Sequence, residues 1–147
     1  MMNMKPKIFL GADHAGYRLK EEIKGILKKL GYECHDFGAN DDNNSYDYPK
    51  KALEVAQAVA RHNARGILFC GTGTGEAIVA NKVKGIRAVN CFNEYTAKMS
   101  REHNNSNVLC LGARVLGKNL AKKITKIWLH TEFSREPRHR RRVKQIE

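Results

Sequence analysis

Residues 66–75 read Gly66-Ile67-Leu68-Phe69-Cys70-Gly71-Thr72-Gly73-Thr74-Gly75. The apolar half of this stretch predicts a strand that is buried on both faces, as in the centre of a parallel sheet. Three glycines at alternate positions then mark a turn into a helix. A buried strand that runs through a glycine turn into a helix is the unit from which α/β domains are built.

Four further runs of β-forming residues recur along the chain, and helical patterns lie between them. These runs are Lys7–Gly11, Tyr32–Phe37, Ile86–Cys91 and Val108–Leu111. The intervening stretches repeat apolar residues at helical spacing, as Leu19, Ile23 and Leu27 do. We therefore predict an α/β fold: a Rossmann-like three-layer α/β/α domain with a five-stranded parallel sheet, forming one domain over residues 1–147.

The C-terminal residues 134–147 fall outside this alternation. Pro137 suits the first turn of one more helix, in which Val143 and Ile146 would be the few apolar contacts. So thin an apolar stripe indicates that this tail packs on a neighbouring subunit or on the edge of the domain.

Composition and cysteine usage restrict the class of protein. The 147 residues are 41% hydrophobic, and no apolar run approaches the roughly 20 residues that span a bilayer. The apolar stretch near the N-terminus, Ile8–Leu10, is too short for a signal-peptide core. The four cysteines lack the spacing of a metal site. We expect a soluble cytoplasmic protein with buried thiols, among which only Cys70 has a position suited to chemistry.

A net charge of +12 points to an anionic partner, since 27 Lys and Arg face 15 Asp and Glu. One interpretation is a nucleic-acid-binding protein, supported by the basic run Arg138–Arg142. This interpretation is weak because the sequence holds no nucleic-acid-binding motif. Arg138 and Arg142 are instead one helical turn apart, so both guanidinium groups could face a single phosphate.

Ligands of open parallel sheets bind beyond the carboxyl ends of the strands. Three loops follow strands there: residues 11–16, 70–76 and 112–114. The glycine loop lets backbone N–H groups point at an anion or a developing oxyanion, but its spacing is neither GxGxxG nor a P-loop. Asp13 and His14 form a pair suited to proton transfer, although Asp13 could simply cap the following helix. His103 could donate a proton or merely favour the end of its helix.

Taken together, these features resemble the ribose-5-phosphate isomerase B family, which includes galactose-6-phosphate and allose-6-phosphate isomerases. The matching residues are Gly11–Gly16, Asp47–Pro49, Cys70–Gly75, Ala80–Lys82, Gly85–Ala88, Ser100–Asn104, Asn107–Leu109, Gly112–Val115, Arg138–His139 and Arg142. The resemblance covers nearly the whole chain. It implies an aldose–ketose isomerase that interconverts ribose 5-phosphate and ribulose 5-phosphate through an enediolate, with no metal and no organic cofactor.

The resemblance also implies roles for individual residues. Asp13 and His103 would open the sugar ring, Asn104 would orient a hydroxyl, and Thr72 would hold or relay a hydroxyl proton. The backbone of the glycine loop would stabilise the enediolate oxygen. The expected substrate- and phosphate-binding residues are Asp13, His14, Tyr48, Gly71, Thr72, Gly73, Thr74, Gly75, Asn104, Arg114, Arg138 and Arg142.

Two residues compete for the role of catalytic base. Members of the family use either a cysteine before the glycine loop or a glutamate at its end, and this sequence has both, Cys70 and Glu76. We favour Cys70, and we expect loop N–H groups and nearby cations to lower the pKa of its thiol. The resemblance further implies a homodimer or homotetramer whose active site is shared between subunits. A six-carbon sugar phosphate remains an alternative substrate.

Overall fold

The computed structural model describes residues 4–147, so residues 1–3 of the predicted domain lie outside it. Five parallel strands form one sheet in the order β2-β1-β3-β5-β4. The strands are β1 (Ile8–Ala12), β2 (Cys34–Asp36), β3 (Arg65–Cys70), β4 (Ala88–Asn90) and β5 (Val108–Gly112). The helices are α1 (Tyr17–Lys29), α2 (Tyr48–His62), α3 (Thr74–Ala80), α4 (Glu94–Glu102), α5 (Lys118–His130) and α6 (Pro137–Ile146).

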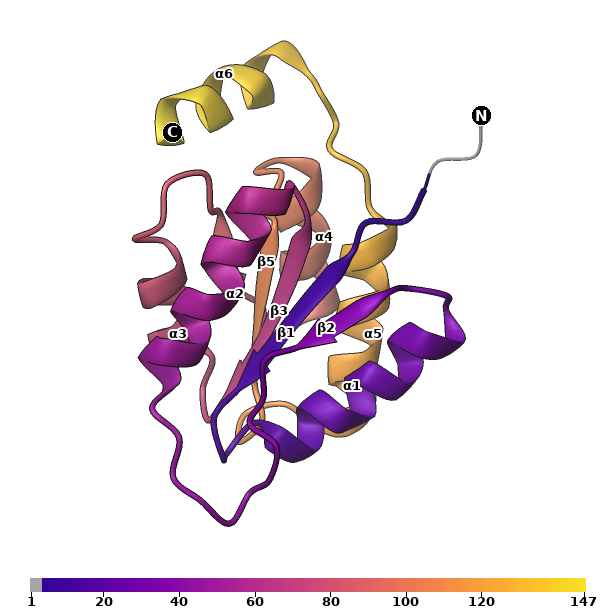
Figure 1. Cartoon of the computed structure of the whole chain (residues 1–147). Helices are drawn as coiled ribbons and strands as arrows, with labels where there is room; N and C mark the ends of the chain where they lie inside the picture. The colour runs from indigo at the N-terminus through magenta and orange to yellow at the C-terminus, as the bar shows by residue number, and fades with distance from the viewer. Residues whose placement is uncertain (1–3) are drawn as a thin grey trace.

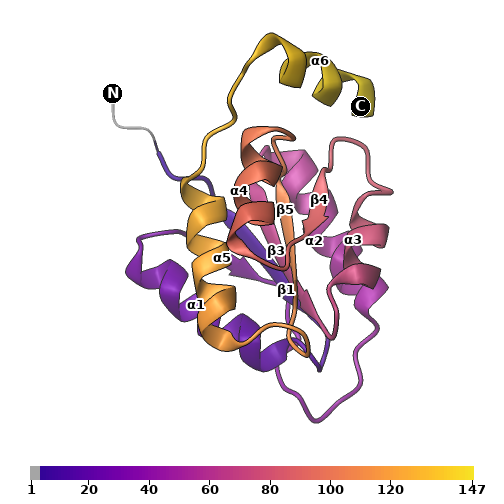
Figure 2. The ribbon, with the colours of Figure 1, turned by 180° about the vertical axis from the view of Figure 1, so that it is seen from behind.

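Helices cover both faces of the sheet, which confirms the predicted three-layer α/β/α fold. Helices α2 and α3 lie on one face, and α1, α4 and α5 lie on the other (Figures 1 and 2). Successive residues of the central strand β3 supply both cores: Ile67 and Phe69 pack with α1 and α5, and Leu68 packs with α2. This alternation explains why the strand is apolar throughout.

The edge strands are shorter than the sequence predicts. The runs Tyr32–Phe37 and Ile86–Cys91 each contain a strand of only three residues, Cys34–Asp36 and Ala88–Asn90. Each of these strands pairs with one neighbour only, so fewer residues are held in the ladder. The central strands β1, β3 and β5 agree with the predicted runs to within a residue at each end.

The strand order places a crevice at the carboxyl ends of β1 and β3. The chain leaves β1 for β2 on one side and then crosses to β3 on the other side of β1. Such a switch of direction opens a ligand-binding crevice in parallel α/β sheets. The turn between β1 and α1 closes tightly on β3 here, because the N–H of Asp13 donates to the carbonyl of Phe69 (3.2 Å).

The predicted helix at Pro137 is present as α6, and it extends away from the three layers (Figure 1). The connection to it is fastened where the N–H of Ser134 donates to the carbonyl of Glu102 (3.0 Å). An ion pair between Arg87 and Glu147 holds its far end. The tail therefore contacts its own domain at both ends, while most of α6 is exposed.

We predict that Gly16→Ala destabilises the protein by about 3 kcal/mol or more, since over-packing against rigid backbone is costly. A Cβ atom at Gly16 would lie 2.2 Å from the carbonyl oxygen of Phe69. Gly25→Ala is the matched control in α1, where no atom lies within 4 Å of the added Cβ. It should stabilise the helix by roughly 0.5–1 kcal/mol. Urea unfolding of both variants tests the pair, and equal effects would contradict it.

Candidate active site

Three loops meet at the carboxyl edge of the sheet, as predicted. Asp13 is bonded to the end of β3 as described above. From the opposite side, the N–H groups of Ala113 and Arg114 donate to the carbonyls of Cys70 (2.8 Å) and Gly71 (2.9 Å). The loops that follow β1, β3 and β5 are therefore tied together by backbone hydrogen bonds, which fixes the side chains they carry.

The glycine loop is braced by Asn90, a residue that the sequence analysis missed. Its Nδ2 donates to the carbonyl of Thr72 (3.1 Å) and to Oγ1 of Thr74 (3.2 Å). Gly73 has a φ of 84°, and a Cβ there would lie 2.5 Å from Oδ1 of Asn90. Both the conformation and the close contact require glycine. Asn90 is the last residue of β4, so its position at a strand's carboxyl end was the available signal.

A cavity of ≈ 680 Å³ opens beside the loop, and Asp13, His14 and Tyr48 are among its lining residues. The Oδ1 of Asp13 accepts from the N–H of Gly16 (3.0 Å) and so closes the turn before α1, whose N-cap is Gly16 itself. Its Oδ2 has no donor among residues 4–147 and is available to a ligand. The Nδ1 of His14 accepts from the N–H of Tyr46 (3.2 Å), which leaves Nε2 as the ring nitrogen that can contact a ligand.

Two further residues that are predicted to bind the substrate, Tyr48 and Arg114, lie against the same loop. A Cβ at Gly75 would lie 2.6 Å from the Tyr48 ring, so the missing side chain of Gly75 makes room for Tyr48. A Cβ at Gly71 would lie 3.5 Å from the Arg114 side chain, which places this exposed guanidinium beside the start of the loop. Thr72 and Thr74 are also exposed, and the Oγ1 of Thr72 accepts from the N–H of Thr74 (3.3 Å).

Cys70 and Glu76 lie together beneath the loop. The N–H of Gly73 donates to Sγ of Cys70 (3.1 Å). Burial, and then the charge of Glu76, nevertheless raise the pKa of Cys70 to about 11. The expected lowering is therefore wrong for the single chain: the loop N–H groups do lower the pKa of the thiol, but desolvation outweighs them. No cation is among the main influences on the pKa of this thiol, contrary to our expectation.

Glu76 is fully buried, and neither of its carboxyl oxygens has a hydrogen-bond partner of good geometry among the described residues. Burial, and then repulsion from Asp13, raise the pKa of this carboxyl well above its usual value, whereas the Cys70 thiol lowers it. A buried polar group without partners is costly, which makes this carboxyl a candidate functional group.

The remaining predicted residues lie at the opposite edge of the sheet. His103 follows the end of α4, and four residues later the carbonyl of Asn107 accepts from the N–H of Gly66 at the start of β3 (2.9 Å). At about 3.3 Å per residue, the six residues of β3 separate the two edges by roughly 17 Å. His103 and Asn104 therefore cannot reach Cys70 of the same chain. Arg138 and Arg142 belong to α6, beyond this far edge (Figure 2).

His139 organises this second group and was not among the predicted site residues. Its ring lies against that of His103, with 4.2 Å between centroids and a tilt of 33° between the ring planes, and its Nδ1 shares a hydrogen bond with Oγ of Ser134 (2.6 Å). Burial, and then the adjacent His103, lower the pKa of His139. The pair joins the end of α4 to α6, so the position of His103 depends on the tail.

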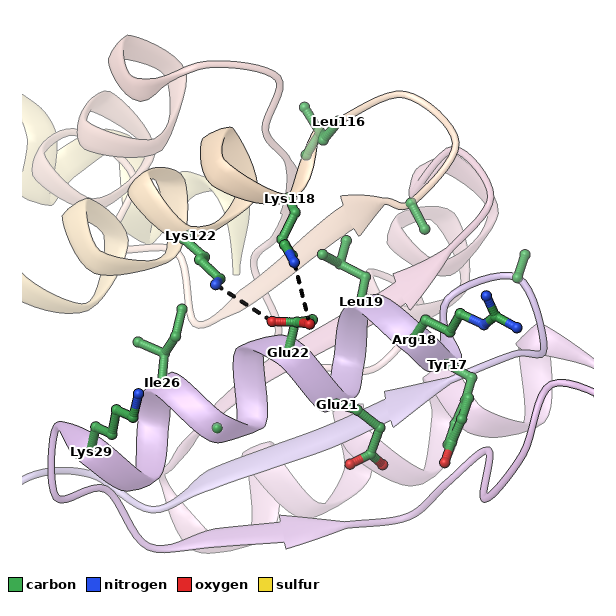
Figure 3. A pocket seen from close by; sticks show the side chains of 13 residues that line it. Tyr17, Arg18, Leu19, Glu21, Glu22, Ile26, Lys29, Leu116, Lys118 and Lys122 are labelled. Atoms are coloured by element: carbon green, nitrogen blue, oxygen red, sulfur yellow. Dashed lines mark ion pairs between the residues drawn. The ribbon is translucent and has the colours of Figure 1, made fainter.

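A groove of ≈ 830 Å³ lies between α1 and α5 and contains none of the predicted site residues. Glu22 bridges it by ion pairs to Lys118 (3.5 Å) and Lys122 (3.4 Å), over the apolar side chains of Leu19, Ile26 and Leu116 (Figure 3). Its two carboxylates, Glu21 and Glu22, are engaged in ion pairs with lysines. The candidate active site is therefore the smaller cavity beside the glycine loop.

A family model described as Ribose/Galactose Isomerase matches residues 8–146. The chain belongs to this family. Ribose-5-phosphate isomerase B of Escherichia coli is 47% identical over 141 residues, covering 95% of this chain and 93% of the relative. A D-erythrulose-4-phosphate isomerase of Pectobacterium atrosepticum is 44% identical over 128 residues, covering 86% and 84%. The ribose-5-phosphate isomerase B of Mycoplasma genitalium, solved with bound ribulose-5-phosphate, superposes with a TM-score of 0.93 at 39% identity, covering 98% and 95%.

Membership of the ribose/galactose isomerase family confirms the resemblance seen in the sequence and favours an enzyme over a nucleic-acid-binding protein. None of the helices within residues 4–147 has the length and apolar character needed to cross a membrane. Within the same residues, no three His, Cys, Asp or Glu side chains cluster closely enough to hold a metal ion.

We predict that Glu76→Gln stabilises this isomerase progressively as the pH rises above 4.5. In the unfolded chain the Glu76 carboxyl ionises near its ordinary value of 4.5, whereas in the folded chain it stays neutral to a much higher pH. Each pH unit between the two values therefore costs the folded state up to about 1.4 kcal/mol. The variant should remove this loss, as measured by the free energy of unfolding in urea from pH 5 to pH 8.

Glu94→Gln is the control for this experiment, because Glu94 is an exposed glutamate at the start of α4. It should leave the pH dependence of the wild-type chain unchanged. If Glu76→Gln also leaves that dependence unchanged, the carboxyl is ionised in the folded protein and the description above is wrong.

Proposed function

We propose that this chain interconverts ribose 5-phosphate and ribulose 5-phosphate through an enediolate. The observation that carries the proposal is the pair of proton-carrying groups, Cys70 and Glu76, beneath a glycine loop at the edge of the sheet where a cavity is lined by Asp13, His14 and Tyr48. The bound ribulose-5-phosphate of the Mycoplasma genitalium relative supports the choice of a five-carbon substrate. The negative charge of a sugar phosphate matches the cationic side chains that we expect around this cavity.

We assign the proton transfer to Cys70 rather than to Glu76. The thiolate removes the proton from C2, and the electrons of the C2–H bond form the C1–C2 double bond while those of the carbonyl move to O1, which gives the enediolate. The proton of the C2 hydroxyl passes to O1, relayed by Thr72. The C2–O bond then becomes the carbonyl as the electrons of the double bond take the proton back from the thiol at C1, which gives the ketose. Cys70 is 5% exposed, whereas Glu76 is 0% exposed and cannot touch a substrate without moving. Glu76 instead lies behind the thiol, where it can exchange a proton with it. The enediolate oxygen would be stabilised by backbone N–H groups of the glycine loop.

The raised pKa of Cys70 implies that the site needs cations that the single chain does not bring to it. Arg114 lies beside the loop, but the two other arginines of the proposed phosphate site, Arg138 and Arg142, lie beyond the opposite edge. In a complex these arginines and the substrate phosphate would surround the loop. We therefore propose that His103, Asn104, Arg138 and Arg142 complete the active site of a second copy of the chain.

Exposed apolar side chains support this homodimer. Residues around the carboxyl edge leave large parts of their surface uncovered: Tyr48 40%, Ile78 59%, Phe92 50%, Tyr95 70% and Val115 52%. Four of them, Tyr48, Phe92, Tyr95 and Val115, lie near a strand end or a helix start at this edge, whereas Ile78 lies within α3. Exposed apolar surface of this kind is typical of protein interfaces. The free thiols of all four cysteines fit a reducing compartment, so we place the enzyme in the cytoplasm.

The substrate is tested by comparing sugar phosphates of different length. We expect ribose 5-phosphate to give the highest kcat/KM among ribose 5-phosphate, allose 6-phosphate, galactose 6-phosphate and D-erythrulose 4-phosphate. The last is included because it names the Pectobacterium atrosepticum relative. If a four- or six-carbon compound gives a higher kcat/KM, that compound is the substrate in place of ribose 5-phosphate, and the proposed isomerisation chemistry is unchanged. Loss of every activity in a folded protein would contradict it.

The base is tested by exchange of the C2 proton with deuterated solvent, followed by NMR. Cys70→Ala should slow exchange by a hundredfold or more, because a positioned base contributes about 10²–10⁴ to the rate. Glu76→Gln should retain measurable exchange and lower the pH at which the Cys70 thiol ionises, since a negative charge is removed. Near-normal exchange in Cys70→Ala would transfer the role to Glu76.

The shared site is tested by mixing inactive variants. Cys70→Ala and His103→Ala alter opposite edges of the sheet, so a mixed dimer contains one site with both changes and one with neither. Random mixing through subunit exchange should restore about a quarter of wild-type activity, since half of the dimers are mixed and each has one intact site of two. Mixing Cys70→Ala with Arg114→Ala, which alter the same edge, should restore none. Activity restored equally by both mixtures would contradict the arrangement.

A further inference from the structure

Four arginines surround a second cavity, at the amino edge of the sheet. Its volume is ≈ 440 Å³, and Arg65, Arg101, Arg135 and Arg140 line it together with Asn105, Glu132 and Phe133. None of these residues belongs to the proposed active site. Arg65 begins β3 and Arg101 is in α4, whereas Arg135 and Arg140 come from the C-terminal tail. The cavity therefore lies between the domain and its tail.

Its charge is not balanced. Four guanidinium groups face one carboxylate, Glu132, an excess of three positive charges. Among residues 4–147, none of the four arginines forms an ion pair, although eleven ion pairs occur elsewhere in that part of the chain. Burial, and then repulsion from Arg65, lower the pKa of Arg101 to about 10. An added anion would relieve this repulsion.

The two arginines of the domain are held rigidly. Arg101 is only 4% exposed; its Nε donates to the carbonyl of Thr131 (3.2 Å) and its Nη1 to Oδ1 of Asn105 (3.0 Å) and to the carbonyl of Ser106. Its Nη2 has no acceptor among the described residues. The Nη1 of Arg65 donates to the carbonyl of Leu129 (3.1 Å), and its guanidinium lies 5.5 Å from the centre of the Trp128 ring. Guanidinium groups fixed in this way lose little freedom when they bind an anion.

The two arginines of the tail are placed by the turn that leads into α6. Arg135 has a φ of 59°, a left-handed conformation that long side chains rarely adopt. This turn brings both Arg135 and Arg140 to the cavity, while Arg138 is paired with Glu136 (3.0 Å) and is not among the lining residues. Helix α6 thus divides its arginines between this cavity and the face that we assign to the partner's active site.

We propose that this cavity binds a small polyanion with two linked phosphates, which bridges the tail to the domain. A pyrophosphoryl group carries about three negative charges at neutral pH, which matches the excess, and paired guanidinium groups are well suited to phosphate oxygens. The bound anion joins Arg65 and Arg101 to Arg135 and Arg140, so it fixes the helix that carries Arg138 and Arg142. The site goes beyond the proposed isomerase reaction and does not depend on it.

Isothermal titration with pyrophosphate tests the site, with saturating ribose 5-phosphate present to occupy the active site. Wild-type protein should bind. Arg140→Gln should weaken binding by about tenfold, the usual effect of losing one charged hydrogen-bond donor. Arg135→Asn should weaken it similarly, because asparagine tolerates the left-handed turn while removing the charge. Arg141→Gln is the matched control: it removes the same charge from an exposed position of α6 that does not line the cavity, and it should bind as the wild type does.

Hydrogen exchange gives a second readout, since a bridging anion should slow exchange of the amides from Ser134 to Arg140. The proposal fails if wild-type protein does not bind pyrophosphate, which would also be the outcome if a partner subunit fills the cavity. It fails if Arg140→Gln and Arg141→Gln weaken binding equally, because binding would then follow net charge. It fails too if ribose 5-phosphate displaces the pyrophosphate, since the anion would then occupy the active site.

Discussion

The contact between the first turn of the chain and the end of the central strand is the constraint on which the site depends. Gly16 approaches the Phe69 carbonyl so closely that no side chain fits between them, and the Asp13 N–H is bonded to the same carbonyl. This contact sets Asp13 beside Cys70 and Glu76. It therefore produces both the geometry of the site and the repulsion that, after burial, raises the pKa of Glu76.

The spacing of apolar residues was sufficient to predict the three-layer architecture, because strands and helices differ in that spacing. The fully apolar run Gly66–Cys70 identified the centre of the sheet, and the loops after β1, β3 and β5 could be assigned to one edge because parallel strands share a direction. The lengths of the edge strands could not be predicted, since pairing on one side depends on neighbours distant in the sequence. The brace formed by Asn90 was missed for the same reason: its partners, Thr72 and Thr74, lie 16 or more residues earlier.

The chemistry of the site was predicted less completely than its position. The sequence identifies Cys70 and Glu76 as the two candidate bases, but a pKa depends on burial and on neighbours in space. Desolvation reverses the expected shift of Cys70, and only the structure shows that Glu76 lies fully buried. The sequence also could not show that His103 and Cys70 belong to opposite edges, because that separation follows from the antiparallel course of α4 relative to the strands.

The two edges of a parallel sheet are not equivalent, because the carboxyl ends of all strands lie at one edge and the amino ends at the other. The two edges can therefore carry different functional groups. In this chain the carboxyl end carries the proton-transfer groups, and the amino end carries His103 and the arginines of α6. A two-fold axis that brings the carboxyl edge of one chain to the amino edge of its copy also brings the amino edge of the first chain to the carboxyl edge of the copy. In the proposed dimer the active sites therefore arise only in pairs, and the two halves carried by one chain each meet a half from its copy.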